Sequence, residues 1–342
     1  MESIRRYLWI DHLRALAVSG VVCIHVAGIV LYQYNSAGLA DWWIGNIFDS
    51  ASRFALPIFG MLIGATLLQS KESMQLFYQK RMLRLLPPLL FWGAIYLVFY
   101  FALSIYHKEH YTLNSFFEWL YSKLEIGVSV HFWYVYMVIL MYLIMPFFRA
   151  WIQKQSNRNL LIFLAIWYLL LVLQIPYISD NYWIKKTLYF IHFLGYPVLG
   201  FYLMNHTVKS TPVLLVLWLG MLFYTAFRTY SSTTVDGEFF DQYYSYLSPN
   251  IVLMSLSIFL LVQRFTINNT YVLSALHFLS KYSYGISMVH LIILWLLSFA
   301  GITWQLIHPA FGIIVTTLLC LLFSGMVVSL IHRQRWGKYI SG

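Results

Sequence analysis

Long runs of apolar residues, separated by short polar segments, recur along the whole of this 342-residue chain. About 20 apolar helical residues are needed to cross the hydrocarbon core of a bilayer. Runs of this length predict ten transmembrane helices, at residues 10–33, 47–69, 85–106, 130–149, 159–177, 187–205, 211–228, 248–264, 282–300 and 309–331. The sequence therefore predicts an all-α, polytopic membrane protein in which residues 1–342 form a single transmembrane domain.

Composition supports the prediction of a membrane protein. Hydrophobic residues make up 61% of the chain and charged residues only 10%, whereas about a quarter of an ordinary soluble domain is charged. The first apolar run contains Arg14 and His25 and lacks a small-residue cleavage site, so we expect a retained helix and not a signal peptide. Cys23 and Cys320 lie inside apolar runs, where we expect packing residues, with no disulfide and no metal site.

The distribution of Lys and Arg accounts for the formal charge of +10. No basic block is interleaved with aromatic residues, so nucleic acid is not an expected partner. With the N-terminus inside, fifteen Lys and Arg fall on the cytoplasmic side and six on the other side, and basic residues favour the cytoplasm. The six are Arg53, Lys108, Lys123, Lys185, Lys186 and Arg228. Both termini are therefore predicted to be cytoplasmic.

Two ionisable side chains share one stripe of the first predicted helix. Arg14 and His25 are eleven residues apart, which corresponds to three helical turns and roughly 16 Å of rise. Acyl-CoA, with an anionic head at the cytoplasmic surface and a thioester inside the bilayer, fits this geometry, and neutral His25 would take the proton of an acceptor hydroxyl. Alternatively, Arg14 snorkels inward and His25 hydrogen-bonds a neighbouring helix. Asp11 either orients Arg14 or caps the helix.

A basic cluster follows the second predicted helix. Arg81 and Arg84 are spaced i, i+3, so they share a helical face, and Lys80 lies beside them. The guanidinium fork suits phosphate oxygens, so the cluster predicts a docking site for the phosphates of CoA. Contact with anionic lipid headgroups is the alternative. Both interpretations place the cluster on the cytoplasmic side.

Other polar and aromatic residues are candidates for binding an acceptor. The connections 107–129 and 229–247 are predicted to lie outside, and the second combines acidic residues with several aromatic residues. That combination suits a carbohydrate. An interfacial aromatic belt is the alternative for the aromatic residues, and snorkelling to the outer headgroups is the alternative for Arg53. For His290, in the ninth predicted helix, the alternative to a functional role is packing through a hydrogen bond. The candidates are Arg53, His131, Trp133, Tyr134, Asp241, Tyr284 and His290.

Several short motifs follow one another along the chain. They are Trp9-Ile10-Asp11-His12-Leu13-Arg14 followed by His25, Ser52-Arg53-Phe54-Ala55-Leu56-Pro57-Ile58-Phe59, Lys80-Arg81-Met82-Leu83-Arg84-Leu85-Leu86-Pro87, His131-Phe132-Trp133-Tyr134 with Pro146, and Tyr282-Ser283-Tyr284-Gly285-Ile286-Ser287-Met288-Val289-His290. In this order they resemble the motifs of the acyltransferase family 3 of integral membrane proteins. The resemblance covers nearly the whole chain, although each motif alone is weakly specific.

The resemblance implies an O-acyltransferase that moves an acyl group, usually acetyl, from cytoplasmic acyl-CoA to a hydroxyl of a surface polysaccharide or glycolipid. It implies a multi-pass protein of the bacterial cytoplasmic (inner) membrane, with the family's Arg and His at Arg14 and His25 and its arginine pair at Arg81 and Arg84. Size and the Ser50-Ala51-Ser52-Arg53 stretch resemble the O-acetyltransferases of the enterobacterial-common-antigen type. One departure is the absence of a serine from Phe59-Gly60-Met61-Leu62-Ile63-Gly64, so no helix hydroxyl is expected to act there.

Other functions are compatible with the same polar stripe. A flippase or exporter of lipid-linked sugars would use it as a pathway, and a non-catalytic subunit of a glycan assembly complex would not need it. If the chain is an enzyme, His25 acts either as a base in direct transfer or as a covalent acyl carrier. Gly60 and Gly64 suit close helix packing, within one chain or in a dimer.

Overall fold

A computed structural model describes residues 2–107, 112–173, 189–206, 208 and 210–342. Every regular element in this part of the chain is a helix, which confirms the predicted fold class. Four residues that entered the orientation count lie outside the described residues: Lys108, Lys185, Lys186 and Lys209.

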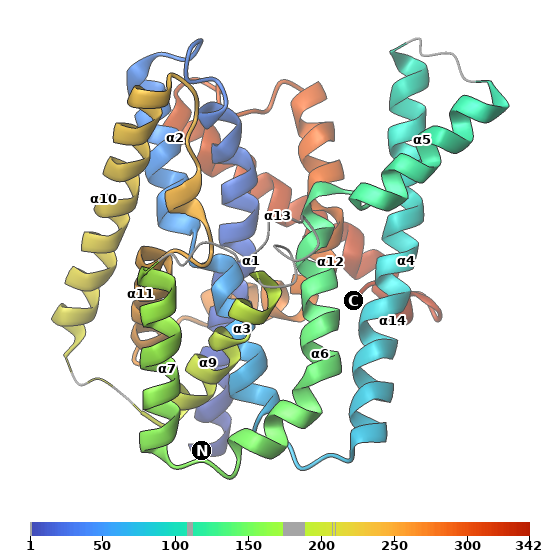
Figure 1. Cartoon of the computed structure of the whole chain (residues 1–342). Coiled ribbons are helices and arrows are strands. Elements are labelled where there is room, and N and C mark those ends of the chain that lie inside the picture. Colours follow the sequence, from blue (N-terminus) through green and yellow to red (C-terminus); the bar gives the residue numbers. More distant parts are fainter. Residues whose placement is uncertain (1, 108–111, 174–188, 207, 209) are drawn as a thin grey trace.

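The structure has a bundle of helices (Figure 1). Long apolar runs form them, as expected from the sequence. The elements are α1 Glu2–Leu31, α2 Leu39–Ser52, α3 Ala55–Leu67, α4 Met74–Tyr106, α5 Leu113–Ile126, the 3₁₀ helix η1 Val130–Phe132, α6 Trp133–Ile152, α7 Asn157–Val172, α9 Gly195–Met204, α10 Thr211–Asp236, the 3₁₀ helix η2 Gln242–Tyr244, α11 Pro249–Val262, α12 Thr270–Phe299, α13 Pro309–Arg333 and α14 Gly337–Ile340. The connections α1–α2, α3–α4, α6–α7 and α12–α13 lie at the two ends of the bundle (Figure 1).

Eight helical segments of the described chain are long and apolar enough to cross a membrane. Two shorter apolar helices, Asn157–Val172 and Tyr189–Met204, correspond to the remaining two predicted spans. The predicted spans 159–177 and 187–205 extend into residues outside the described part. The structure therefore agrees with a polytopic membrane protein, and the orientation of its termini stays a prediction.

The predicted second helix, 47–69, was wrong in its form: it is two helices, α2 and α3, interrupted at Arg53 and Phe54. Pro57 has no backbone N–H, so it cannot donate to the carbonyl of Arg53 four residues earlier. The i to i−4 hydrogen-bond pattern is interrupted there, although Arg53 and Phe54 keep α-helical dihedral angles. The break places Arg53 at a junction between two helices.

Several other predicted helices were too short, among them 85–106, which begins at Met74. The predicted helix 211–228 continues to Asp236, and the predicted helix 282–300 begins twelve residues earlier, at Thr270. The predicted outside connection 107–129 contains a further helix, α5. In each case the added turns contain polar residues, and a count of apolar residues alone ends the helix too early.

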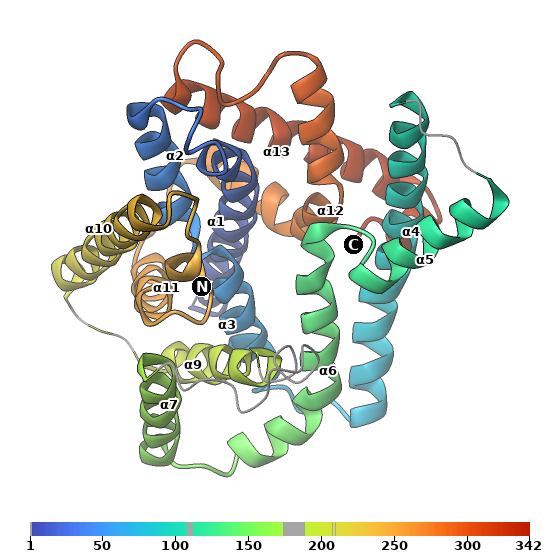
Figure 2. The same ribbon diagram turned by 45° about the horizontal axis from the view of Figure 1, so that its top comes forward.

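Helix α1 lies inside the bundle, in contact with α2, α3, α11, α12 and α13, whereas α4 and α5 lie at the periphery (Figure 2). Small residues let its neighbours approach closely: a Cβ on Gly20 would lie 2.9 Å from the Cβ of Ala55. The alanines Ala15, Ala17 and Ala27 are fully buried. Because protein surrounds α1, its polar residues Arg14 and His25 face other helices and not lipid.

Glycines also bring α3 and α9 together. A Cβ on Gly64 would lie 1.8 Å from the carbonyl oxygen of Pro197, and a Cβ on Gly200 would lie 1.9 Å from that of Met61. At such distances only hydrogen fits, so each glycine permits direct backbone contact. Gly60 contacts Tyr196 on the same interface. The small residues of α3 therefore serve packing within the chain.

Candidate functional site

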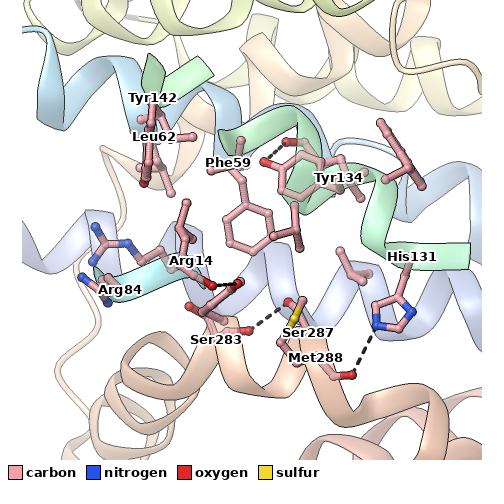
Figure 3. A pocket seen from close by; sticks show the side chains of 18 of the residues that line it. Arg14, Phe59, Leu62, Arg84, His131, Tyr134, Tyr142, Ser283, Ser287 and Met288 are labelled. Atoms are coloured by element: carbon pink, nitrogen blue, oxygen red, sulfur yellow. Dashed lines mark hydrogen bonds between the residues drawn. The ribbon is translucent and has the colours of Figure 1, made fainter. Parts of the chain in front are cut away.

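A cavity of about 430 Å³ lies between α1, α3, α4, α6 and α12. Residues from both halves of the chain line it, and apolar side chains form much of the wall. Figure 3 shows arginines at one end, His131 toward the other, and the ring of Phe59 between them. The two ends therefore differ in chemistry.

Three arginines line the first end of the cavity: Arg14 from α1, and Arg81 and Arg84 from α4. Arg14 and Arg84 lie near one another in Figure 3. Guanidinium groups that converge from two helices repel each other unless an anion lies between them. This end of the cavity is therefore suited to an anionic group of a ligand.

Asp11 holds Arg14 in place. Its carboxylate lies 3.6 Å from Nη1 of Arg14 and accepts a hydrogen bond of 2.6 Å from the hydroxyl of Ser280 on α12. Helix α1 begins at Glu2, nine residues earlier, so Asp11 does not cap the helix. The carboxylate links α1 to α12 and orients the arginine toward the cavity.

Three histidines line the opposite end: His25 from α1, His131 from η1 and His290 from α12. The ring centres of His25 and His290 are 5.0 Å apart, and those of His131 and His290 are 5.1 Å apart. Among the described residues, no three His, Cys, Asp or Glu side chains are placed to hold a metal ion. Each imidazole ring can also donate and accept protons.

Hydrogen bonds fix the protons of two of these rings. Nε2 of His131 lies 3.2 Å from the carbonyl oxygen of Met288 and must donate to it, so Nδ1 of the neutral ring accepts from the Ser129 hydroxyl at 3.0 Å. Nδ1 of His290 lies 2.9 Å from the carbonyl oxygen of Ser287 and donates likewise. The buried Nε2 of His290 then presents a lone pair with no partner among the described residues.

His25 differs from its two neighbours. Neither of its ring nitrogens has a hydrogen-bond partner within the described chain, and the side chain is only half-buried because it faces the cavity. A neutral imidazole with a free nitrogen in a cavity is available to take a proton from a bound hydroxyl. The structure thus places His25 and Arg14 in one cavity, as the eleven-residue spacing predicted, while their chemical roles stay predictions.

Aromatic side chains form the wall near the histidines. The rings of Trp133 and Tyr246 stack with centres 5.9 Å apart, and the Tyr134 hydroxyl donates to the carbonyl of Leu56. Tyr284 lines the cavity nearer the arginines, where its hydroxyl donates to the carbonyl of Leu85. Flat rings with a polar edge can contact both an apolar chain and a hydroxylated ligand.

Three residues proposed from the sequence do not line this cavity. Arg53 forms an ion pair with buried Asp49, and its guanidinium lies 4.2 Å from the ring centre of Tyr244. Lys80, in the N-terminal part of α4, donates to Glu72 in the α3–α4 connection. Asp241 is exposed next to η2. Arg53 still lies near the cavity wall, because its guanidinium is 5.8 Å from the ring centre of Tyr246.

Sequence reasoning missed several residues of the cavity. Ser280, Ser283 and Ser287 line it from α12. Tyr246 lines it from the chain before α11; it belongs to the aromatic residues of the predicted connection 229–247 but was not among the candidates. The serines recur at three- and four-residue intervals in an apolar helix, a pattern that predicts one polar face. The position of Tyr246 has no such periodic signal, because it lies between two helices.

Comparison with known families agrees with the resemblance seen in the motifs. The sequence profile of the acyltransferase domain of acyltransferase family 3 matches residues 7–325. Searches among curated proteins and solved structures gave no match. The matched segment includes all five helices that line the cavity.

Proposed function

The chain belongs to acyltransferase family 3, and from this premise we propose that it transfers an acyl group from acyl-CoA to a hydroxyl of a glycan. The observation that supports this proposal most is one cavity with arginines at one end and histidines at the other. An acyl-CoA has anionic phosphates at one end and a reactive thioester at the other. The two ends of the ligand therefore match the two ends of the cavity.

The donor binds with its phosphates at the arginine end. Arg14, Arg81 and Arg84 present planar forks of N–H groups, which suit phosphate oxygens better than a point charge does. The pantetheine arm then passes the apolar wall around Phe59 and Leu62, toward His25. By resemblance to its family, the usual acyl group is acetyl, so acetyl-CoA is the expected donor.

The chemistry requires one base and one leaving group. As the oxygen of the acceptor hydroxyl bonds to the thioester carbonyl carbon, His25 takes the hydroxyl proton. The carbon–sulfur bond then breaks, and the departing thiolate of CoA receives that proton, giving an ester and free CoA. In a two-step variant, His25 first takes the acyl group itself and then passes it to the hydroxyl.

The acceptor binds against the aromatic wall near the histidines. Trp133, Tyr134 and Tyr246 offer ring faces for a sugar and polar edges for its hydroxyls. We propose a surface polysaccharide or glycolipid, such as a lipopolysaccharide or the lipid-linked precursor of enterobacterial common antigen. Arg53 and Asp241 would contact a part of this acceptor beyond the cavity. The membrane is proposed to be the bacterial inner membrane.

The test uses purified protein in nanodiscs with radiolabelled acetyl-CoA, with and without a lipid-linked glycan extract. Label should enter the glycan fraction with wild-type protein and be lost in His25→Ala and in Arg14→Ala, while both variants stay folded by size-exclusion chromatography. His107→Gln, an exposed histidine at the end of α4, is the matched control and should keep activity. An active His25→Ala enzyme would remove the base from this mechanism.

Two further measurements separate the alternatives. Rapid denaturation near neutral pH, before the acceptor is added, recovers labelled protein only if His25 carries the acyl group. If the wild-type protein binds no acetyl-CoA and transfers no label, a flippase or exporter becomes the next hypothesis, and movement of lipid-linked sugar across proteoliposomes would test it.

A further inference from the structure

A second group of cations lies beside the arginine end of the cavity. Lys80, Arg81 and Arg149 surround Glu72, which belongs to the connection between α3 and α4; we call these four residues the outer cluster. Glu72 accepts from Lys80 at 2.8 Å and lies 3.4 Å from Nη2 of Arg81. Arg149, from the last turn of α6, donates from Nη2 to the backbone carbonyl of Glu72 at 2.7 Å. Two cations therefore share one carboxylate, and a third bonds to the backbone of the same residue.

The outer cluster contains donors that no protein group satisfies. Nε of Arg81 and Nη1 of Arg149 are buried and have no hydrogen-bond partner among the described residues. Both guanidinium groups also lie beside the ring of Phe77, at 5.5 and 5.9 Å from its centre. A charged donor that is buried without an acceptor destabilises a protein, and the group as a whole keeps a net charge of about +2 from three cations and one carboxylate. The site is incomplete without an additional anion.

Position along α4 relates the outer cluster to the cavity. Arg81 precedes Arg84 by three residues, which is about 4.5 Å of rise toward the N-terminal end of the helix. Arg84 lies near Arg14 (Figure 3), while Arg81 contacts both the cavity and Glu72. The cations thus form an inner pair, Arg14 and Arg84, and an outer cluster one turn farther from the histidines.

The order of anionic groups in acyl-CoA matches this order. Counted from the thioester, the molecule has a pantetheine arm, a pyrophosphate, and then a ribose that carries a 3′-phosphate. We propose that the outer cluster binds the 3′-phosphate of CoA through Lys80, Arg81 and Arg149, in place of the Glu72 carboxylate. The inner pair is then left for the pyrophosphate. This inference rests on the proposed function, since it assigns one group of the proposed donor.

The charge of a phosphate monoester fits the site. Such a group carries about −1.5 to −2 near neutral pH and has three acceptor oxygens. It would therefore offset more of the positive charge of Lys80, Arg81 and Arg149 than the carboxylate does, and it would give acceptors to the free Nε of Arg81 and Nη1 of Arg149. The carboxylate of Glu72 occupies the same position with one charge less, so it acts as a competitor that the phosphate displaces.

Binding of two nucleotides that differ in one phosphate tests the site directly. Adenosine 3′,5′-bisphosphate should bind wild-type protein about tenfold or more tightly than 5′-AMP, because charge-assisted hydrogen bonds to the 3′-phosphate are lost in the second ligand. Arg149→Ala should remove most of this difference by weakening only the bisphosphate. Arg158→Ala, which removes an exposed cation from the start of α7, is the matched control and should keep the difference.

Kinetics with acetyl-CoA and its 3′-dephospho analogue give a second readout. Wild-type protein should show a KM at least about tenfold lower for acetyl-CoA, with similar kcat, and Arg149→Ala should raise that KM toward the value for the analogue. Equal binding of the two nucleotides by wild-type protein would overturn the inference. Equal loss with both donors in Arg149→Ala would also overturn it, because Arg149 would then only hold the α3–α4 connection in place.

A variant of Glu72 tests the displacement. Glu72→Gln removes the competing charge and should tighten binding of adenosine 3′,5′-bisphosphate several-fold, with little change for 5′-AMP. Weaker binding would show that the carboxylate does not occupy the phosphate position. The nucleotide measurements need no acyl transfer, so failure of transfer with intact 3′-phosphate selectivity would reject the proposed function and leave this site standing.

Discussion

The imidazole rings of His25 and His290 lie 5.0 Å apart, centre to centre, although 264 residues separate them in the sequence. Nδ1 of His290 donates to the carbonyl of Ser287, so its buried Nε2 has only an acceptor lone pair to offer. A small rotation of His25 would let the single N–H group of its neutral ring donate to that lone pair. The other nitrogen of His25 would then carry the lone pair that a base requires.

His290 is therefore expected to position His25. Replacing it by Phe keeps a ring of similar shape and removes the acceptor, so kcat should fall about 10²-fold while KM for acetyl-CoA changes little. His290→Gln retains a carbonyl acceptor and should recover part of kcat. Steady-state kinetics of acetyl transfer in nanodiscs measures both values. Equal kcat in the Phe and Gln variants would contradict a role through the acceptor lone pair.

The buried ion pair at the α2–α3 junction predicts a large loss of stability when one partner is removed. Asp49 is fully buried, and only 14% of the Arg53 side chain is exposed. Arg53→Ala leaves an uncompensated carboxylate and should destabilise the protein by about 3–5 kcal/mol. The double variant Asp49→Asn with Arg53→Gln should unfold at a higher temperature than Arg53→Ala, as followed by tryptophan fluorescence in detergent. A double variant less stable than the single one would refute this account.

Arg53→Lys separates stability from acceptor binding. Lysine keeps the charge beside Asp49, so the melting temperature should fall less than in Arg53→Ala. If Arg53 contacts the acceptor, the KM for the glycan should still rise in this variant, and the KM for acetyl-CoA should not.

Close backbone packing predicts that two glycines respond in opposite ways to the same substitution. Gly64→Ala would place a Cβ 1.8 Å from the Pro197 carbonyl oxygen, so α3 and α9 must separate, which should cost about 1–3 kcal/mol or more. Gly220→Ala, on α10, has no atom within 4 Å of the added Cβ among the described residues and should be neutral or slightly stabilising. Thermal unfolding of both variants in one detergent compares them. Equal melting temperatures would show that the α3–α9 contact is looser than described.

Glu72 predicts a dependence of stability on pH. The hydrogen bond from Lys80 is the largest cause that lowers the pKa of Glu72, and Arg81 adds to it. A carboxyl group whose pKa is lower in the folded state stabilises that state above its usual pKa of about 4.3, and the contribution is lost as pH falls through the lowered value. The melting temperature of wild-type protein should exceed that of Glu72→Gln near pH 7, and the difference should vanish in acid. A difference that grows in acid would contradict this sign.

Much of the architecture could be predicted from the sequence. Each of the ten predicted spans overlaps an apolar helix, since a run of about 20 apolar residues has few stable conformations other than a helix in a bilayer. The placement of Arg14 and His25 on one cavity also followed from the sequence. Both lie on α1, so the helical repeat alone fixes their relative direction. The same holds for Arg81 and Arg84 on α4.

The contacts between helices could not be predicted in this way. Periodicity gives the phase of residues on one helix, and it does not tell which helix lies alongside. Packing between segments far apart in the chain decided that His290 and His131 join His25. It also decided that Tyr246 completes the wall of the cavity. The sequence by itself determined the helices and the stripe from Arg14 to His25. Only tertiary packing decided which other side chains meet that stripe, because close contacts such as that of Gly64 with Pro197 set which helices lie side by side.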